Sequence, residues 1–257
     1  MVIFVKRGLG QVSGFTILGI VLVAMIILLF FLRGQLGLDT IVPGGLSADA
    51  IKSHVTQCLR EEVPQHLERI GLQGGHLRTP EGTYRLYQDV PVSYLCYNTP
   101  GKRTCQNRML TLPDMEKELG EAIGFSLDTC LDFGAFRKRG YELSVGQRTV
   151  LVAIGPDATM VTVTQPIHLV KGDLVVDEDT FSETFAYPLG RLYGVSQSIV
   201  DTETTVGEFD QLPYMLTHKG EYVIDKKRPY PDKLYLLQTK DSDYLFQFFI
   251  QDEPSQT

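Results

Sequence analysis

An uninterrupted apolar segment near the N-terminus constrains the fold of this chain more than any other feature. No charged side chain occurs between Gly8 and Leu32, and the eighteen residues from Phe15 to Leu32 are almost entirely apolar. A helix of that length rises about 27 Å, close to the roughly 30 Å hydrocarbon thickness of a bilayer. A helix that is apolar on every side is typical of a membrane span. We therefore expect a basic leader over residues 1–10 and a transmembrane helix over residues 11–33.

The residues that flank the apolar segment predict that it is retained, with the N-terminus in the cytoplasm. A cleavable secretory signal has a shorter apolar core and a small-residue cleavage site, and residues 30–35 (FFLRGQ) contain no such site. Lys6 and Arg7 precede the segment and Arg33 follows it, a bias that favours a cytoplasmic N-terminus. We expect a single-pass protein of the cell membrane, in contact with the lipid bilayer, whose C-terminal domain is extracellular.

The chain beyond Arg33 is acidic. It carries 21 basic and 31 acidic residues, a formal net charge of 21 − 31 = −10. Nucleic-acid binding needs an excess of basic side chains to neutralise phosphates, so no nucleic-acid partner is expected. Residues 34–46 contain four glycines and a proline without helical periodicity, which predicts a linker between the membrane and the domain.

Residues 47–257 are expected to form one α+β domain of largely antiparallel strands with about three packed helices. Apolar residues recur at helical spacing over residues 47–70, 113–130 and 188–204. Alternating residues predict a hairpin of 149–154 with 159–165 around the turn at 155–158. The same pattern predicts a strand pair across residues 167–176 that turns at 171–173. It also predicts strands over 181–187, 233–239 and 244–251, and short irregular strands within 77–97.

The cysteines predict two disulfides. An even number of cysteines in an exported domain is typical of a disulfide framework. Cys58 and Cys130 lie on the apolar stripes of two predicted helices, so we expect them to pair, which leaves Cys96 to pair with Cys105. The alternative is four reduced thiols in a cytoplasmic domain. A structural zinc site usually needs closer cysteine spacing than this chain contains.

No sequence motif defines a catalytic centre, and no cofactor is expected. The chain lacks H-E-x-x-H, G-x-S-x-G and P-loop motifs. The acidic run Asp177 to Asp179, with Glu183, has the oxygen ligands for a hard cation, but such a run is more often a solvated turn. His54 and Cys58 have a spacing that suits a metal on one helix face, yet no further ligands lie near them in the sequence. No metal site is predicted.

The N-terminal residues also resemble a known export signal. Lys6 to Ser13 (KRGLGQVS) leads directly into the apolar segment and is similar to the type IV pilin-like, or class III, signal of archaea. The resemblance implies that a prepilin-type peptidase cuts between Gly10 and Gln11, or after Gly8, and leaves the apolar helix in place. Phe15 stands where many members of that family have Glu, which counts against packing into a pilin-type filament. A plain signal anchor is the alternative.

Motifs along the domain resemble a family of membrane-anchored surface proteins that recurs in small-genome archaea. The residues that carry the resemblance are Cys58, Gly71 to Gly75, Leu112-Pro113, Cys130, Gly140-Tyr141, Pro166 to Gly172 and Leu189 to Tyr193. This family is largely uncharacterised and implies location and architecture without catalytic residues.

We expect a non-enzymatic envelope protein with a structural or adhesive role, whose partners are other surface proteins or further copies of itself. One alternative is a subunit of a type IV pilus-like filament or of its machinery. Another is a membrane-tethered exported hydrolase that uses carboxylates such as Asp177, Asp179 and Glu183.

Overall fold

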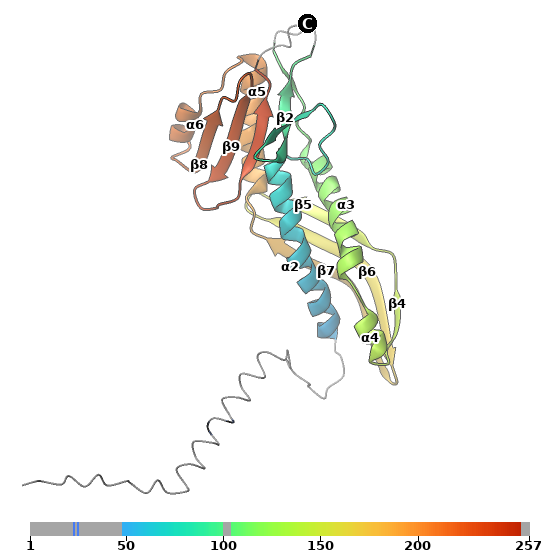
Figure 1. Cartoon of the computed structure of the whole chain (residues 1–257). Coiled ribbons are helices and arrows are strands. Elements are labelled where there is room, and N and C mark those ends of the chain that lie inside the picture. The colour runs from blue at the N-terminus through green and yellow to red at the C-terminus, as the bar shows by residue number, and fades with distance from the viewer. Residues whose placement is uncertain (1–22, 24, 26–47, 100–103, 253–257) are drawn as a thin grey trace, which may run out of the picture. The chain divides into compact units, whose positions relative to one another are not determined.

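The structure is a computed structural model that describes residues 23, 25, 48–99 and 104–252 (Figure 1). The chain divides into two compact units, residues 1–45 and 46–257, and all described residues except Val23 and Met25 belong to the second unit. The predicted leader, transmembrane helix and linker therefore lie outside the described residues, apart from these two, which are helical. Within the described residues, no helix combines the length and the apolar character that a membrane span requires.

Three long helices occupy the segments that were predicted to be helical: α2 (Ala48–Leu72), α3 (Leu112–Cys130) and α5 (Leu189–Thr205). The start of α3 has clear local causes, because the Thr111 side chain accepts a hydrogen bond from the Asp114 N–H and Pro113 lies in the first turn. Two short helices, α4 (Gly134–Lys138) and α6 (Gln211–Thr217), were not predicted. Helices of five and seven residues are too short to display a helical period.

One sheet has the strand order β1-β2-β10-β9-β8, with β3 beside β2. Its strands are β1 (Tyr84–Tyr87), β2 (Val90–Tyr97), β3 (Gln106–Asn107), β8 (Tyr222–Lys227), β9 (Lys233–Thr239) and β10 (Phe246–Ile250). The predicted closing hairpin is confirmed as β9 and β10. The pairing of β10 with β2 is parallel and the other pairs are antiparallel, so the expected antiparallel character holds with one exception.

The second sheet is centred on the long strand β6. Its strands are β4 (Glu142–Val145), β5 (Thr149–Ile154), β6 (Thr159–Lys171) and β7 (Leu174–Phe185). β7 pairs with β6 along its whole length, while β5 and β4 pair with successive parts of β6. The predicted β5–β6 hairpin is confirmed.

The sequence prediction was wrong about how these strands are divided. We expected one strand to end before Pro166 and a turn at Asp177 to Asp179. Instead, β6 continues through Pro166 with a register shift between Thr164 and Ile167, and the acidic run lies within β7. Proline is tolerated because it sits at this irregularity, where its carbonyl accepts a hydrogen bond from the Gly146 N–H.

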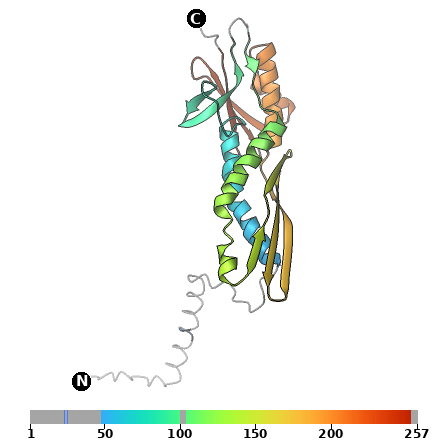
Figure 2. The same cartoon turned by 90° about the vertical axis from the view of Figure 1, so that its right-hand side faces the viewer.

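The helix α2 joins the two sheets (Figures 1 and 2). Its first part lies along β7, where Lys52 pairs with Glu178 and Arg60 with Glu183. Its last turns lie against β10. There the Leu67 carbonyl accepts a hydrogen bond from the hydroxyl of Tyr244, which precedes β10. α3 packs beside α2 and against β5, and α5 packs on β9, β10 and β2. Buried apolar residues from both sheets and all three long helices form one continuous core.

Candidate functional site

The four cysteines form the two predicted pairs. Cys58 on α2 is joined to Cys130 at the end of α3, with 5.9 Å between their Cα atoms. Cys96 on β2 is joined to Cys105, with a Cα separation of 5.2 Å. No cysteine is free. The first pair joins α2 to the end of α3, and the second pair closes the segment between β2 and β3. The predicted peptidase site at Gly10 and Gln11 lies outside the described residues.

Three of the acidic residues on β7 have separate basic partners. Asp177 lies 2.6 Å from His168 of β6, and Glu178 pairs with Lys52 at 3.2 Å. Glu183 pairs with Arg60 at 2.8 Å. Glu178 and Glu183 therefore hold α2 against β7. This arrangement gives no support to a hydrolytic pair or a calcium site formed by these carboxylates.

The histidine that was considered as a metal ligand lies among aromatic rings. The His54 ring centroid is 5.7 Å from that of Phe133 and 5.8 Å from that of Phe136. Its potential co-ligand Cys58 is bonded to Cys130. In the part of the chain that the structure describes, no group of three or more His, Cys, Asp or Glu side chains is placed to hold a metal ion.

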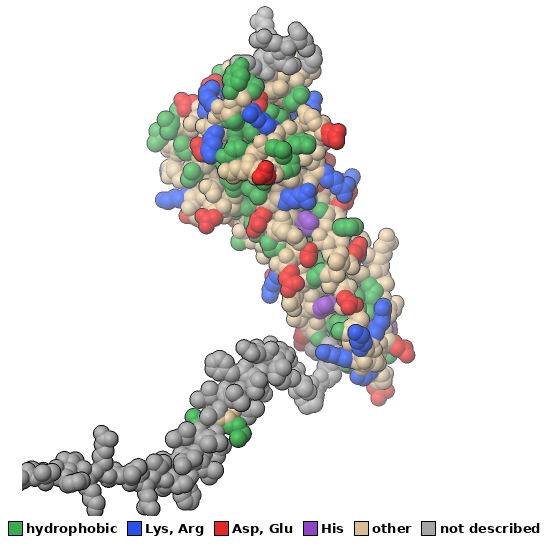
Figure 3. Space-filling model, in the orientation of Figure 1, with side chains coloured by type: hydrophobic (Ala, Val, Ile, Leu, Met, Phe, Trp, Pro, Cys, Tyr) green, Lys and Arg blue, Asp and Glu red, His purple; other side chains and the backbone are tan. Residues whose placement is uncertain are grey.

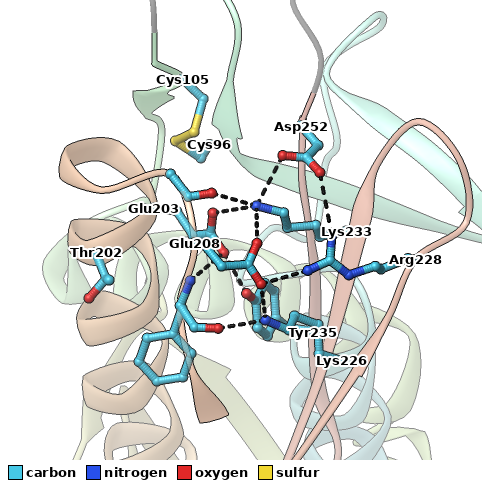
Figure 4. A network of polar contacts seen from close by, with 12 residues as sticks. Cys96, Cys105, Thr202, Glu203, Glu208, Lys226, Arg228, Lys233, Tyr235 and Asp252 are labelled. Atoms are coloured by element: carbon cyan, nitrogen blue, oxygen red, sulfur yellow. Dashed lines mark hydrogen bonds and ion pairs between the residues drawn. A yellow bond between two sulfur atoms is a disulfide. The ribbon is translucent and has the colours of Figure 1, made fainter.

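A buried cluster of charges between α5 and β9 is the most distinctive polar site of the described domain (Figure 4). Lys233 begins β9, and its side chain is only 1% exposed. Its Nζ lies 2.8 Å from Glu203 Oε2, 3.0 Å from Glu208 Oε2 and 3.0 Å from Asp252 Oδ1. It also donates a hydrogen bond to the Gly207 carbonyl at 2.6 Å. Three carboxylates and one carbonyl thus surround a single ammonium group.

The Glu203 carboxylate is held through both oxygens. Oε2 faces Lys233, while Oε1 accepts hydrogen bonds from the Tyr235 hydroxyl at 2.5 Å and from the Phe209 N–H at 3.1 Å. The Glu203 side chain is also 1% exposed. Burial and the hydrogen bond to Glu203 raise the pKa of Tyr235, so its hydroxyl remains a donor.

The more exposed rim of the cluster balances its charge. Glu208 Oε1 accepts hydrogen bonds from Lys226 and Arg228, both at 2.6 Å. Burial alone raises the pKa of Glu208, but the hydrogen bonds from Lys226 and Lys233 outweigh it and lower this pKa to about 2. For Lys233, burial lowers the pKa, but hydrogen bonds to its three carboxylate partners raise it by a larger amount. The net effect is a raised pKa of Lys233. Three basic and three acidic side chains therefore meet in this cluster.

Sequence reasoning missed this cluster, although two signals were present. Glu203 continues the buried stripe of the third predicted helix, three residues after Val200 and four after Ile199. Lys233 opens a strand in which every second residue, beginning with Lys233 itself, is buried. A charged residue at each of two buried positions indicates that the two pair with each other.

A second feature is an uncharged patch on the face of β5, β6 and β7 that points away from the helices. The strand register aligns nine residues in three rows: Thr149, Thr164 and Thr180; Leu151, Thr162 and Ser182; Ala153, Met160 and Thr184. All are exposed except the half-buried Thr162, whose hydroxyl lies 3.0 Å from that of Ser182. Six of the nine carry hydroxyl groups and none is ionisable. We refer to these nine residues as the uncharged patch.

A groove of about 680 Å³ lies between α3 and β5. Three of its five charged residues hold these two elements together. Glu116 accepts a hydrogen bond from the Ile154 N–H at 2.8 Å, and Arg148 donates to Asp128 at 2.8 Å and to the Gly124 carbonyl at 3.1 Å. These contacts therefore attach α3 to the β5 edge of the sheet.

Acidic and basic side chains are interspersed over the face of the domain that Figure 3 shows, and they form no basic stripe there. No protein-family model, curated protein or solved structure matches the chain.

Proposed function

We propose that this chain is a membrane-anchored surface protein of the cell envelope with a structural or adhesive role rather than an enzyme. The observation that carries the proposal is the complete pairing of the cysteines in the domain that follows the apolar segment. Disulfides persist in oxidising compartments outside the cytoplasm. A domain with two disulfides, placed after a segment long enough to span a bilayer, is suited to the outer side of the membrane.

The N-terminal sequence supports the same location. The basic leader that ends in Gly10 and precedes Gln11 resembles the class III signal, which retains the apolar helix as an anchor. Because Phe15 replaces the Glu of many filament-forming relatives, we favour an isolated or laterally associated surface protein over a pilus subunit.

The uncharged patch is the contact surface that best suits lateral association with a second copy of the chain. The chain beyond Arg33 has a formal net charge of −10, so two copies repel each other when most surfaces approach. The nine residues of the uncharged patch carry no charge. Two copies that meet there bring hydroxyl and apolar groups together without opposing like charges.

Intact mass spectrometry of protein extracted from native membranes tests the proposed location, with thiol alkylation before and after reduction. We expect a chain that begins at Gln11 and has no thiol that reacts before reduction. A chain with four reactive thiols places the domain in the cytoplasm and contradicts the proposal. Protease treatment of intact cells provides an independent readout, because an extracellular domain is released and a cytoplasmic one is protected.

A further inference from the structure

The pair formed by Lys233 and Glu203 is unusual because both side chains are removed from water. Each is 1% exposed, and Nζ lies 2.8 Å from Oε2. Burying two charges costs several kcal/mol per ion, which their attraction offsets only in a well-ordered setting, so a buried ion pair is not explained by stability alone. The same contact places a primary amine beside a carboxyl group, the two groups that condense to an amide.

The second oxygen of Glu203 lies in a site that stabilises developing negative charge. The Tyr235 hydroxyl and the Phe209 N–H both donate to Oε1, at 2.5 Å and 3.1 Å. In the tetrahedral intermediate of acyl transfer, negative charge collects on one oxygen. Two hydrogen-bond donors directed at that oxygen in a site removed from water stabilise the intermediate. Oε2, which faces Lys233, is left as the oxygen to be expelled.

A proton acceptor for the ammonium group is also in place. Asp252 Oδ1 lies 3.0 Å from Nζ, within the range for general base catalysis. Glu208 Oε2 lies at the same distance, but the low pKa of Glu208 makes it a poor proton acceptor. The surroundings are largely aromatic, since the Tyr235 ring stacks on Phe248 with a centroid distance of 5.4 Å and contacts Phe209 edge-on at 6.2 Å. The carboxylate partners favour the ammonium form of Lys233, so the loss of its proton is the slow part of the reaction.

We propose that Lys233 and Glu203 condense to an intramolecular amide bond between Nζ and the Glu203 side-chain carbonyl carbon, Cδ. Asp252 takes one proton from Nζ, and the freed lone pair attacks Cδ while Oε1 receives the displaced electron pair. Collapse of this intermediate breaks the bond from Cδ to Oε2. Two of the three ammonium protons leave with Oε2 as water and the third remains on the amide, so the step needs no oxidant, reductant or co-reactant.

The bond would join the last turns of α5 to the first residue of β9, across thirty residues of sequence. Lys233 and Cys96 belong to strands of the same sheet, but the amide bond, unlike the Cys96–Cys105 disulfide, would resist reduction. The chemistry depends on the geometry of the cluster and is independent of the proposed surface location.

Mass spectrometry of the full chain, reduced and alkylated after extraction, tests the inference without any variant. The expected mass is lower by one water molecule than the mass calculated from the N-terminus found in the same digest. The digest is expected to contain a branched peptide in which Lys233 is linked to Glu203. A full mass with two linear peptides overturns the inference. A branched peptide that links Lys233 to Glu208 or Asp252 in place of Glu203 also overturns it. Both results leave the proposed location intact.

Variants separate this reaction from loss of water elsewhere in the chain. Lys233→Arg is expected to keep the full mass. The control Lys227→Arg changes a half-exposed lysine outside the cluster and is expected still to lose one water molecule.

Glu203→Gln is expected to lose ammonia in place of water, because the leaving group is then an amide nitrogen. Asp252→Asn is expected to slow bond formation by about 100-fold, a usual contribution of a general base. A loss of water that persists in Lys233→Arg overturns the inference.

Discussion

At the scale of single residues, the described domain uses its buried polar groups to hold elements together. Glu203 and Lys233 join α5 to β9. His66 does the same for the two central helices, because its Nε2 lies 2.7 Å from the Ser126 hydroxyl of α3. Such contacts depend on protonation state, so they make stability depend on pH.

The two partly buried histidines of the α2 region are expected to lower stability as pH falls. Burial lowers the pKa of His66 and of His76 below the ordinary value of 6.5. The unfolded chain therefore binds more protons than the folded chain just below pH 6.5, and the free energy of unfolding decreases as pH falls from above 6.5 towards the folded pKa values. Urea unfolding at pH 7.5 and about pH 5.5 measures this decrease. The double variant His66→Gln, His76→Gln is expected to show a smaller decrease, and an unchanged pH dependence contradicts the assignment.

At the scale of elements, close backbone contacts fix how the helices are placed on the sheets. The start of α5 lies against the β5–β6 turn, where the Arg191 N–H donates to the Pro156 carbonyl at 3.3 Å. Gly190 permits this approach, since a methyl group there would lie 2.5 Å from the Gly155 carbonyl oxygen. Gly194, one turn later in the same helix, has no such neighbour within 4 Å.

These two glycines provide a matched test of how α5 is positioned. Gly190→Ala is expected to destabilise the domain by about 1–3 kcal/mol, because the added methyl group forces the helix away from the turn. Gly194→Ala is expected to stabilise it by about 0.5–1 kcal/mol, since alanine has the higher helix propensity. Chemical unfolding of both variants measures the difference, and equal effects would show that α5 does not approach the turn closely.

At the scale of the whole domain, covalent links act on segments of very different length. The Cys58–Cys130 bridge spans 72 residues and the Cys96–Cys105 bridge spans 9. A bridge restricts the unfolded chain more strongly when it closes a longer loop. The α2–α3 bridge is therefore expected to contribute more to stability.

Removing each disulfide by a pair of alanine substitutions tests this expectation. Cys58→Ala with Cys130→Ala is expected to lower the free energy of unfolding by about 4 kcal/mol, and Cys96→Ala with Cys105→Ala by about 2.5 kcal/mol. Equilibrium unfolding under oxidising conditions compares them. A larger loss from the short loop would contradict an account based on chain entropy.

Lateral association through the uncharged patch is tested by placing a charge within it. Leu151→Glu is expected to reduce the cross-linked dimer of the membrane-extracted protein, because two copies then oppose carboxylates where they meet. Leu216→Glu on α6 is the control, since Leu216 is 78% exposed and Leu151 is 63% exposed. Equal dimer yields from the two variants would rule out the patch as the contact.

The features that could be predicted from sequence are those encoded within one segment. Helical periodicity located α2, α3 and α5, and alternation located the β5–β6 and β9–β10 hairpins. The cysteine pairs also followed from local pattern, because Cys58 and Cys130 share the buried stripes of two helices. The short helices α4 and α6 were missed, since five and seven residues display too little of a helical period. The strand β8 was also missed, and its second half consists of charged residues.

The buried charge cluster and the uncharged patch could not be predicted from sequence, because both depend on contacts between segments far apart in the chain. Glu203 and Lys233 are thirty residues apart, and they meet only because α5 packs on the sheet. The same packing brings Tyr235 and Phe209 to the Glu203 carboxylate. The uncharged patch likewise depends on the register of three strands, because a shift of one residue would turn every side chain to the opposite face. Local pattern determines which segments become helices or strands through hydrophobic periodicity, whereas tertiary packing decides which buried charges and exposed faces come together.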